Sequence, residues 1–570
     1  MKERLKKFLH SPLLWIFIAF LPALIIYSNR FLIPDTSTDS ISYHVFNGTR
    51  GINNPLTPFL KTEFYPVGIG NIAPGLDIIN AIVRSVLGYR LGTILSLLAT
   101  LGIIVVLYKF LKLILEASKR KFHAGWGLLL VGMPIILELQ FQLATYFIDI
   151  LNTYFVLLVL YYLVTLLKKN KLLSLSQWSI SLILTGLLLA FKLTNIPLVV
   201  PMIFLLLGNL YRYRTDVKKQ DLISRLTLVI VLILLPLVPL WLQNIRLSGN
   251  PTFPYYNGIF KSIYYPSTNF LDVIFGGKTF ISRALWPLFS LWQHERLGEP
   301  YQIYFGTKLF IYWITAVILL LFCLAKKIKL NLVEKSLLFY FLCSILLWGI
   351  LFGITRYIIP AMAIGGLLTV ILVVNSMNIS NIRLRRLMLS FCTISILALG
   401  VESYRIMSFN FNYDMSWRPT LLNTKLLHRK QVRHLFDKQL SVTPKERQLI
   451  NNSDVLLNCH TNVSGLLVLL PGSSNKPAYS IISDQLPQYD VMSNLSSYKI
   501  MAKKRLGLND NIKTINWVSV VSPKDVGPTK QSCLTNISSR GGVINYDSEL
   551  DSMLGDKSIH LEFIAGTLPI

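Results

Sequence analysis

The chain has 570 residues, 53% of them hydrophobic, and a formal net charge of +28. A composition this apolar excludes an ordinary soluble globular protein. A large positive charge can indicate a nucleic-acid partner, but Lys and Arg lie mostly in short segments between long apolar runs. That arrangement is typical of membrane proteins. We therefore expect no nucleic acid as a partner, and we expect anionic membrane lipids or lipid phosphates instead.

The first apolar run predicts a membrane helix at about residues 11–28. It follows a basic N-terminal segment, Met1-Lys-Glu-Arg-Leu-Lys-Lys, and no small-residue cleavage site comes after it. The run therefore predicts an uncleaved first helix and not a removed signal peptide. Because Lys and Arg gather on the cytoplasmic side, we expect a cytoplasmic N-terminus. A long polar loop, residues 29–90, would then lie on the outer side.

Ten further apolar runs carry the chain back and forth across the membrane, and every predicted cytoplasmic turn is basic. Seven of these spans are predicted at about 91–111, 124–141, 147–167, 177–191, 196–210, 223–243 and 308–325. A ninth and a tenth flank Arg356, and an eleventh lies at about 387–402. A second long outer loop covers residues 243–307. The sequence therefore predicts an α-helical polytopic protein of the cell membrane with about 11 transmembrane helices.

The composition changes near residue 402. Beyond it, Asn, Ser, Asp and Lys are frequent, and the apolar runs shorten to strand length between Pro, Gly and Ser. We expect residues 1–402 to form the membrane domain and residues 403–570 an extracytoplasmic α/β domain. Cys459 and Cys533 fall in this second part, and their spacing leaves open whether they pair.

Two acids near the outer ends of predicted spans are candidates for chemistry. Asp39 lies in the segment Asp39-Ser-Ile-Ser-Tyr43-His44. In a helix, Asp39 and Tyr43 share one face at i, i+4 spacing, and a carboxylate there could act as a general base. The alternative role for Asp39 is a helix N-cap. Asp149 begins the fourth span, where an acid is either functional or simply favoured by the helix dipole.

Three cations lie on the predicted outer side, where the topological bias does not explain them. Lys192 is in the turn between the fifth and sixth spans, Arg246 opens the second long loop, and Arg356 lies between the ninth and tenth spans. A guanidinium suits phosphate, and a lysine can bind a lipid phosphate as a point charge. The alternatives are snorkelling for Lys192 and interfacial anchoring beside tyrosines for both arginines.

Motifs for other chemistries are missing from the sequence. There is no phosphate-binding Gly-rich loop, no dinucleotide fingerprint and no His/Cys pattern at zinc spacing. ATP-driven transport by this chain alone is therefore not expected. A pair of carboxylates could bind a hard divalent cation, so the sequence leaves metal dependence open.

In their order along the chain, these segments resemble the GT-C superfamily of integral-membrane glycosyltransferases. The resemblance is to bacterial relatives of the protein O-mannosyltransferases and of the lipid A aminoarabinose transferases. The segments that carry it are Asp39-Ser-Ile-Ser-Tyr43-His44, Asp149, Phe191-Lys192-Leu-Thr, Gly249-Asn-Pro-Thr-Phe-Pro254 and Arg356-Tyr-Ile-Ile-Pro360. The resemblance implies transfer of a sugar from a polyprenyl-phosphate donor to a glycan, lipid or protein acceptor at the outer membrane face. Direct displacement of the phosphate would invert the anomeric centre.

The resemblance also implies roles for the candidate residues. Asp39 is the expected catalytic base, and Asp149 is expected to position the acceptor, the donor or a metal. The expected ligands of the donor phosphate are Lys192, Arg246 and Arg356. The candidates for positioning donor or acceptor are Tyr43, His44 and Glu63. The mannosyltransferases often carry adjacent acids in the first loop, whereas Asp35 and Asp39 are separated here.

Two other functions stay open at the level of the sequence. In a lipid-linked glycan flippase or transporter, the same cations would hold a lipid phosphate without chemistry. An O-antigen-type polymerase or ligase is also a multi-span protein, with its key residues mostly in late outer loops. A variant that binds the lipid donor without turnover would separate an enzyme from a carrier.

Overall fold

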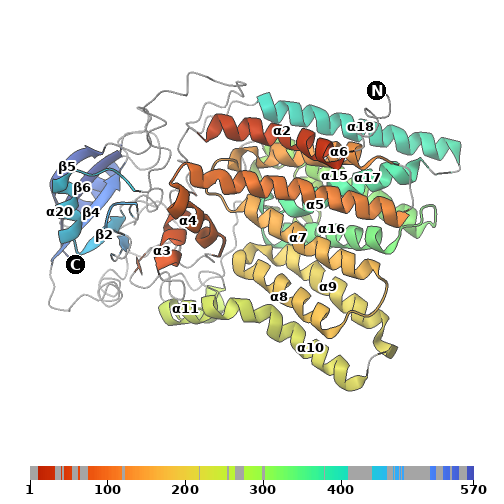
Figure 1. Cartoon of the computed structure of the whole chain (residues 1–570), viewed down its shortest axis with the longest axis horizontal. Coiled ribbons are helices and arrows are strands. Elements are labelled where there is room, and N and C mark those ends of the chain that lie inside the picture. The colour runs from red at the N-terminus through yellow and green to blue at the C-terminus, as the bar shows by residue number, and fades with distance from the viewer. Residues whose placement is uncertain are drawn as a thin grey trace.

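Figure 1 shows the computed structural model, in which a bundle of long helices carries a small sheet domain at one end. The structure describes residues 11–31, 40, 44–53, 62–63, 75–118, 122–216, 218–252, 256–262, 275–297, 302–377, 379, 381–408, 439–458, 467, 469–473, 476, 478–480, 514–521, 530–538, 542–550 and 561–569. Each structural statement below refers to these residues.

The helices of the bundle are α2 (Pro12–Arg30), α5 (Ile94–Ser118), α6 (Ala124–Leu139), α7 (Asp149–Lys168), α8 (Leu175–Phe191), α9 (Ile196–Arg212), α10 (Lys219–Leu234), α11 (Val238–Ser248), α15 (Gln302–Leu324), α16 (Leu332–Leu351), α17 (Ile359–Ser376) and α18 (Ile382–Ser408). Within the described ranges, nine helical segments are long and apolar enough to cross a membrane, and two shorter apolar helices cover 12–28 and 175–191. Together they coincide with the eleven predicted spans.

The helices differ in how far they are buried in the bundle. α17 lies at its centre, with 94% of its most apolar window buried, and it packs against α6, α15 and α16. For α10 and α18 the buried shares are 17% and 22%, and both turn large apolar side chains outward. Outward-facing Leu, Ile and Val suit lipid, because hydrocarbon chains are as apolar as these side chains. A polytopic helical membrane protein is therefore confirmed.

Two helices lie between the bundle and the sheet domain, α3 (Val45–Asn53) and α4 (Gly75–Leu87) (Figure 1). They pack closely at Gly48, where an added Cβ would lie 2.3 Å from the backbone oxygen of Asp77. Only glycine permits this approach. The contact brings the beginning of α3 against the beginning of α4, which matters for the site described below.

The C-terminal part forms a six-stranded sheet flanked by α20 (Pro444–Asn452) and α23 (Lys530–Ser538). Its strands are β2 (Val455–Asn458), β3 (Ala478–Ser480), β4 (Thr514–Val521), β5 (Val543–Leu550) and β6 (Leu561–Pro569), with β1 (Thr62–Glu63) from the first long loop. The strand order is β1-β3-β2-β4-β6-β5; the pairs along β1, β3, β2 and β4 are parallel, and those of β6 with β4 and β5 are antiparallel. The predicted C-terminal α/β fold is thus confirmed, with one strand supplied by residues 62–63.

A buried apolar cluster joins the two parts. Val45 and Phe46 of α3 share it with Tyr146, which lies between α6 and α7, and with sheet residues such as Val518 and Phe563. The end of the bundle that holds the α6–α7 connection therefore faces the sheet domain. In that domain Cys533 is buried and disulfide-bonded, whereas Cys459 lies outside the described residues.

Candidate active site

The α6–α7 connection is held in place by an arginine from another helix. Arg30, at the end of α2, donates from Nη1 to the backbone carbonyls of Gln140, Phe141 and Leu143, at 2.9, 2.7 and 2.7 Å. Ala144 follows with a positive φ of 60°, and its N–H donates to Ser96 Oγ at 3.1 Å. These contacts satisfy the carbonyls that the end of a helix leaves without partners. They fix the turn from which α7 begins.

Asp149 is the first residue of α7, and its side chain is 3% exposed. It forms an ion pair with Lys192, the residue that follows α8 and whose side chain is 13% exposed. Gln142 donates from Nε2 to the second carboxylate oxygen of Asp149 at 3.3 Å. The acid and the lysine that the sequence singled out independently are thus direct partners.

A pair of amides reinforces the same junction. Asn152 and Asn195 exchange two hydrogen bonds through their side-chain amides, at 2.8 and 2.7 Å, and both side chains are buried. Asn195 also donates to the backbone oxygen of Leu188, at 2.7 Å. Asn152 follows Asp149 by three residues, and Asn195 follows Lys192 by three. The amide pair therefore lies one helical turn from the ion pair and fixes the α8–α9 turn against α7.

The turn between α16 and α17 completes the cluster. In this 3-10 turn, η9 (Thr355–Tyr357), the Tyr357 ring lies 4.5 Å from Lys192 Nζ. The Cζ atom of Arg356 lies 5.6 Å from the same ring and 5.8 Å from the ring of Phe147. The structure therefore brings Asp149, Lys192 and Arg356 together from three connections. Two cations and one carboxylate leave a net positive charge, which suits an anion such as phosphate.

His44 lies beside this cluster and has a partner that the sequence did not suggest. Its Nδ1 is 2.7 Å from Oδ1 of Asp77, and both side chains are buried. Burial raises the pKa of the Asp77 carboxyl, and the His44 imidazole opposes that shift. The His44 ring centroid is 5.9 Å from that of Phe147, the ring that Arg356 also approaches. An acid in the first turn of the amphipathic helix α4 was the available signal for Asp77.

The structure does not describe the side chains of the remaining candidate residues. Asp39 and Tyr43 lie outside the described residues. Glu63 is in β1, where its backbone is in register with Tyr479 of β3, and Arg246 is in α11. The side chains of Glu63 and Arg246 are likewise outside the described part of the chain.

A second buried ion pair, near the same end of the bundle, also escaped the sequence analysis. Lys308 Nζ of α15 lies 2.9 Å from Glu138 Oε1 of α6, and both side chains are fully buried. The lysine also donates to the backbone oxygen of Pro134 at 3.2 Å. Glu138 is the only charged residue of α6, and Lys308 is the only charged residue of α15. Ionisable residues inside spans are costly to keep, and that rule could have identified both.

The described residues do not offer a metal site. Among them, no group of three or more His, Cys, Asp or Glu side chains is arranged to hold an ion. The Asp149 carboxylate is engaged by Lys192 and Gln142. Hard cations take several oxygen ligands, which Asp149 alone does not supply. The acids of the first outer loop, Asp35 and Asp39, lie outside the described residues.

The fold and the cluster define a class: a polytopic helical membrane protein with a cationic polar site at one end of its bundle, facing an α/β domain. Comparison with protein families refines this class. Residues 77–241 match the family described as dolichyl-phosphate-mannose-protein mannosyltransferase. The matched segment contains Asp77, Asp149 and Lys192. The resemblance to membrane glycosyltransferases that the sequence predicted is confirmed by this match.

The structure is similar to two crystal structures of ArnT from Cupriavidus metallidurans. The structure bound to undecaprenyl phosphate is 11% identical in sequence, with a TM-score of 0.46 over 97% of this chain and 98% of that chain. The apo structure is 10% identical, with a TM-score of 0.48 over 97% of each chain. No curated protein matches the chain.

Proposed function

We propose that this chain transfers a sugar from a polyprenyl-phosphate donor to a glycan, lipid or protein acceptor at the outer membrane face, with inversion at the sugar. The observation that carries the proposal is the convergence of Asp149, Lys192 and Arg356 at one end of the bundle. The matched family supports the class of donor, since its description names a mannose carried on dolichyl phosphate. A site at the end of the membrane helices suits a donor whose lipid lies in the bilayer.

In the proposed reaction, the acceptor oxygen bonds to the anomeric carbon as the bond from that carbon to the donor phosphate breaks. The leaving phosphate keeps the bonding electron pair and gains negative charge. Lys192 and Arg356 stabilise that charge, which fixed cations do most effectively in a site of low dielectric. Arg246 is the third proposed phosphate ligand. Direct displacement inverts the anomeric centre.

Asp149 acts in this proposal by positioning Lys192. Its carboxylate favours the charged form of the lysine and fixes its direction, while the ammonium group retains further N–H donors for a phosphate. Asp39 is the proposed general base that takes the acceptor proton as the new bond forms. Tyr43, His44 and Glu63 are the proposed positioning residues for donor or acceptor. No step is assigned to a divalent cation.

The outer face is the proposed location of the site, with a cytoplasmic N-terminus. The basic connections lie at the opposite end of the bundle, as the cytoplasmic bias of Lys and Arg predicts. The disulfide at Cys533 supports an extracytoplasmic sheet domain, because structural disulfides persist in oxidising compartments.

The test uses the full chain in lipid vesicles with a radiolabelled polyprenyl-phosphate sugar. Mass spectrometry of cell-surface glycans, with and without the chain, first identifies the product. Asp39→Asn should then bind donor normally while turnover falls by about 10²–10⁴-fold, the usual contribution of a general base. Asp35→Asn is the matched control and should cost much less.

Two outcomes would overturn parts of this proposal. Movement of labelled donor across the vesicle membrane with no product, in wild type, would make the chain a flippase. Near-normal transfer by Asp39→Asn, with Glu63→Gln inactive, would move the base to Glu63.

A further inference from the structure

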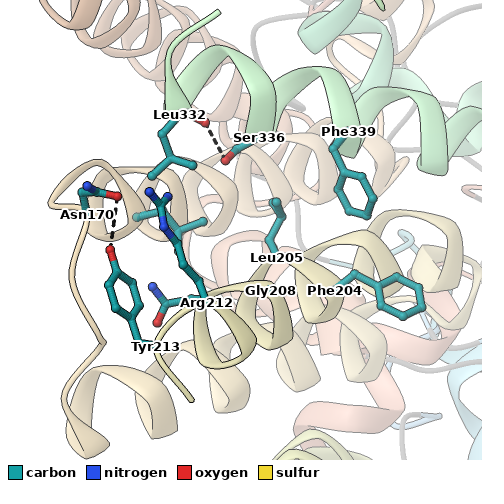
Figure 2. A pocket seen from close by; sticks show the side chains of 11 residues that line it. Asn170, Phe204, Leu205, Gly208, Arg212, Tyr213, Leu332, Ser336 and Phe339 are labelled. Atoms are coloured by element: carbon teal, nitrogen blue, oxygen red, sulfur yellow. Dashed lines mark hydrogen bonds between the residues drawn. The ribbon is translucent and has the colours of Figure 1, made fainter. Parts of the chain in front are cut away.

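A cavity of about 300 Å³ lies at the other end of the bundle, among the ends of α7 and α9 and the beginning of α16 (Figure 2). α7 runs from Asp149 at the proposed active site to Lys168 beside this cavity. A helix rises 1.5 Å per residue, so the two places are about 30 Å apart, the thickness of a bilayer core. The cavity is therefore distinct from the proposed donor site.

The mouth of the cavity is polar and positive. Tyr213 donates from its hydroxyl to Asn170 Oδ1 at 3.2 Å, and Arg212 Cζ lies 5.7 Å from the Tyr213 ring centroid (Figure 2). Arg212 is exposed, and no carboxylate of the described residues forms an ion pair with it. Further exposed lysines occur on the adjoining connections, at Lys168, Lys169, Lys171, Lys326, Lys327 and Lys329. The charge at the mouth complements an anionic head group.

The body of the cavity is apolar and open along the helices. Phe204 of α9 and Phe339 of α16 line it, and these side chains are 52% and 39% exposed. Gly208 lies one turn after Phe204 on α9, and an added Cβ there would meet no atom within 4 Å. The space beside Gly208 is therefore empty, and its walls suit a hydrocarbon chain.

We propose that this cavity binds an anionic diacyl glycerophospholipid. The phosphate lies at Arg212, within reach of Asn170 and Tyr213, and one acyl chain lies along Phe204, Leu205 and Phe339. Basic pockets between membrane helices commonly take anionic head groups. Such a lipid bridges α9 and α16, the helices whose opposite ends border Lys192 and Arg356. This inference goes beyond the proposed sugar transfer and does not depend on it.

The test is native mass spectrometry of the full chain, delipidated in detergent and titrated with phosphatidylglycerol or phosphatidylcholine of the same acyl chains. Wild type should prefer phosphatidylglycerol by about fivefold or more, since one basic residue near a lipid phosphate contributes about that factor. Arg212→Gln should abolish the preference. Gly208→Leu should fill the cavity and weaken binding of both lipids by about tenfold, a loss of 1.4 kcal/mol.

The matched control is Gly400→Leu in α18, because a Cβ at Gly400 also meets no atom within 4 Å. It should bind lipid as wild type does. Neither leucine should disturb folding, since leucine favours helix more than glycine does, and thermal unfolding of both variants checks this. Unchanged lipid binding by Gly208→Leu, or an equal affinity of wild type for the two lipids, would overturn the proposal. So would displacement of phosphatidylglycerol by an equimolar polyprenyl phosphate, which would make the cavity a donor site.

Discussion

Asp149 and Lys192 are 43 residues apart in the sequence and form an ion pair between the beginning of α7 and the turn that follows α8. Lys192 also lies against the ring of Tyr357, from the α16–α17 turn. One ammonium group therefore connects three parts of the bundle at the place where we propose the donor phosphate binds.

Lys192→Ala should raise the KM for a polyprenyl-phosphate donor by about thirtyfold. This corresponds to about 2 kcal/mol, the usual loss when a charged hydrogen-bond partner is removed. The measurement is initial rate against donor concentration. Lys168→Ala, at the opposite end of α7, is the matched control and should leave this KM unchanged.

A double variant separates binding from folding at this position. Lys192→Ala alone leaves the Asp149 carboxylate buried without its cation, which destabilises the fold. Lys192→Ala with Asp149→Asn should recover the melting temperature while the donor KM stays high. Recovery of both quantities would show that Lys192 serves only the fold.

Asn152→Ala and Asn195→Ala should each lower the free energy of unfolding by about 1–3 kcal/mol, because each leaves a buried amide unsatisfied. The double variant should cost less than the sum of the two, since the residues are direct partners. Thermal unfolding in detergent measures this coupling. Both single variants should also raise the donor KM through movement of Lys192. Asn209→Ala, at the far end of α9, should destabilise the protein without that effect.

His44→Ala should destabilise the protein by about 3 kcal/mol at neutral pH, because it removes the imidazole that pairs with the buried Asp77 carboxylate. Burial raises the pKa of Asp77, and removing His44 removes the main influence that opposes the shift. The folded variant then binds a proton more tightly than the unfolded chain. The stability of the variant should therefore fall as the pH rises from the usual titration range of a carboxyl group to the raised pKa of Asp77 in the folded protein.

The measurement is the melting temperature of His44→Ala between about pH 5 and pH 8, relative to wild type. The deficit should be larger at the higher pH. His44→Ala combined with Asp77→Asn removes the titrating carboxyl and should show a deficit that does not grow with pH across this range. If the single variant loses the same melting temperature at every pH, Asp77 is not the group whose titration sets its stability.

Glu138→Gln should destabilise the protein by about 3–5 kcal/mol, because it leaves Lys308 charged and unpaired among buried side chains. Glu138→Leu with Lys308→Met should restore most of the loss, since an apolar pair often replaces a buried ion pair at little cost. Thermal unfolding measures both. A double variant as unstable as the single one would show that the charges themselves hold α15 against α6.

The orientation of the chain can be tested by cysteine labelling in intact cells, in a background without Cys323, Cys343 and Cys392. The exposed positions Ser85 and Asn452 should react with an impermeant thiol reagent after substitution by cysteine. Lys169→Cys, exposed at the basic end, should react only after the cells are opened. Labelling of Lys169→Cys alone in intact cells would invert the predicted topology.

The sequence by itself determined the eleven apolar spans and the cationic candidates. Both are local properties of the chain, since a span needs only enough consecutive apolar residues to cross hydrocarbon. An isolated charge beside a span, such as Asp149, Lys192 or Arg356, is conspicuous because it is costly to bury there. A change of composition near residue 402 also predicted where a second domain begins.

Only the tertiary structure decided which of these groups meet. The pairing of Lys192 with Asp149, the partnership of His44 with Asp77 and the buried Glu138–Lys308 pair each join segments that are far apart in the sequence. The same is true of β1, whose two residues complete a sheet built mainly after residue 450. Hydrophobic periodicity records which face of a segment is buried, but not which segment covers it. Partner choice depends on helix packing and on the paths of the connections, and these arise only when the whole chain folds.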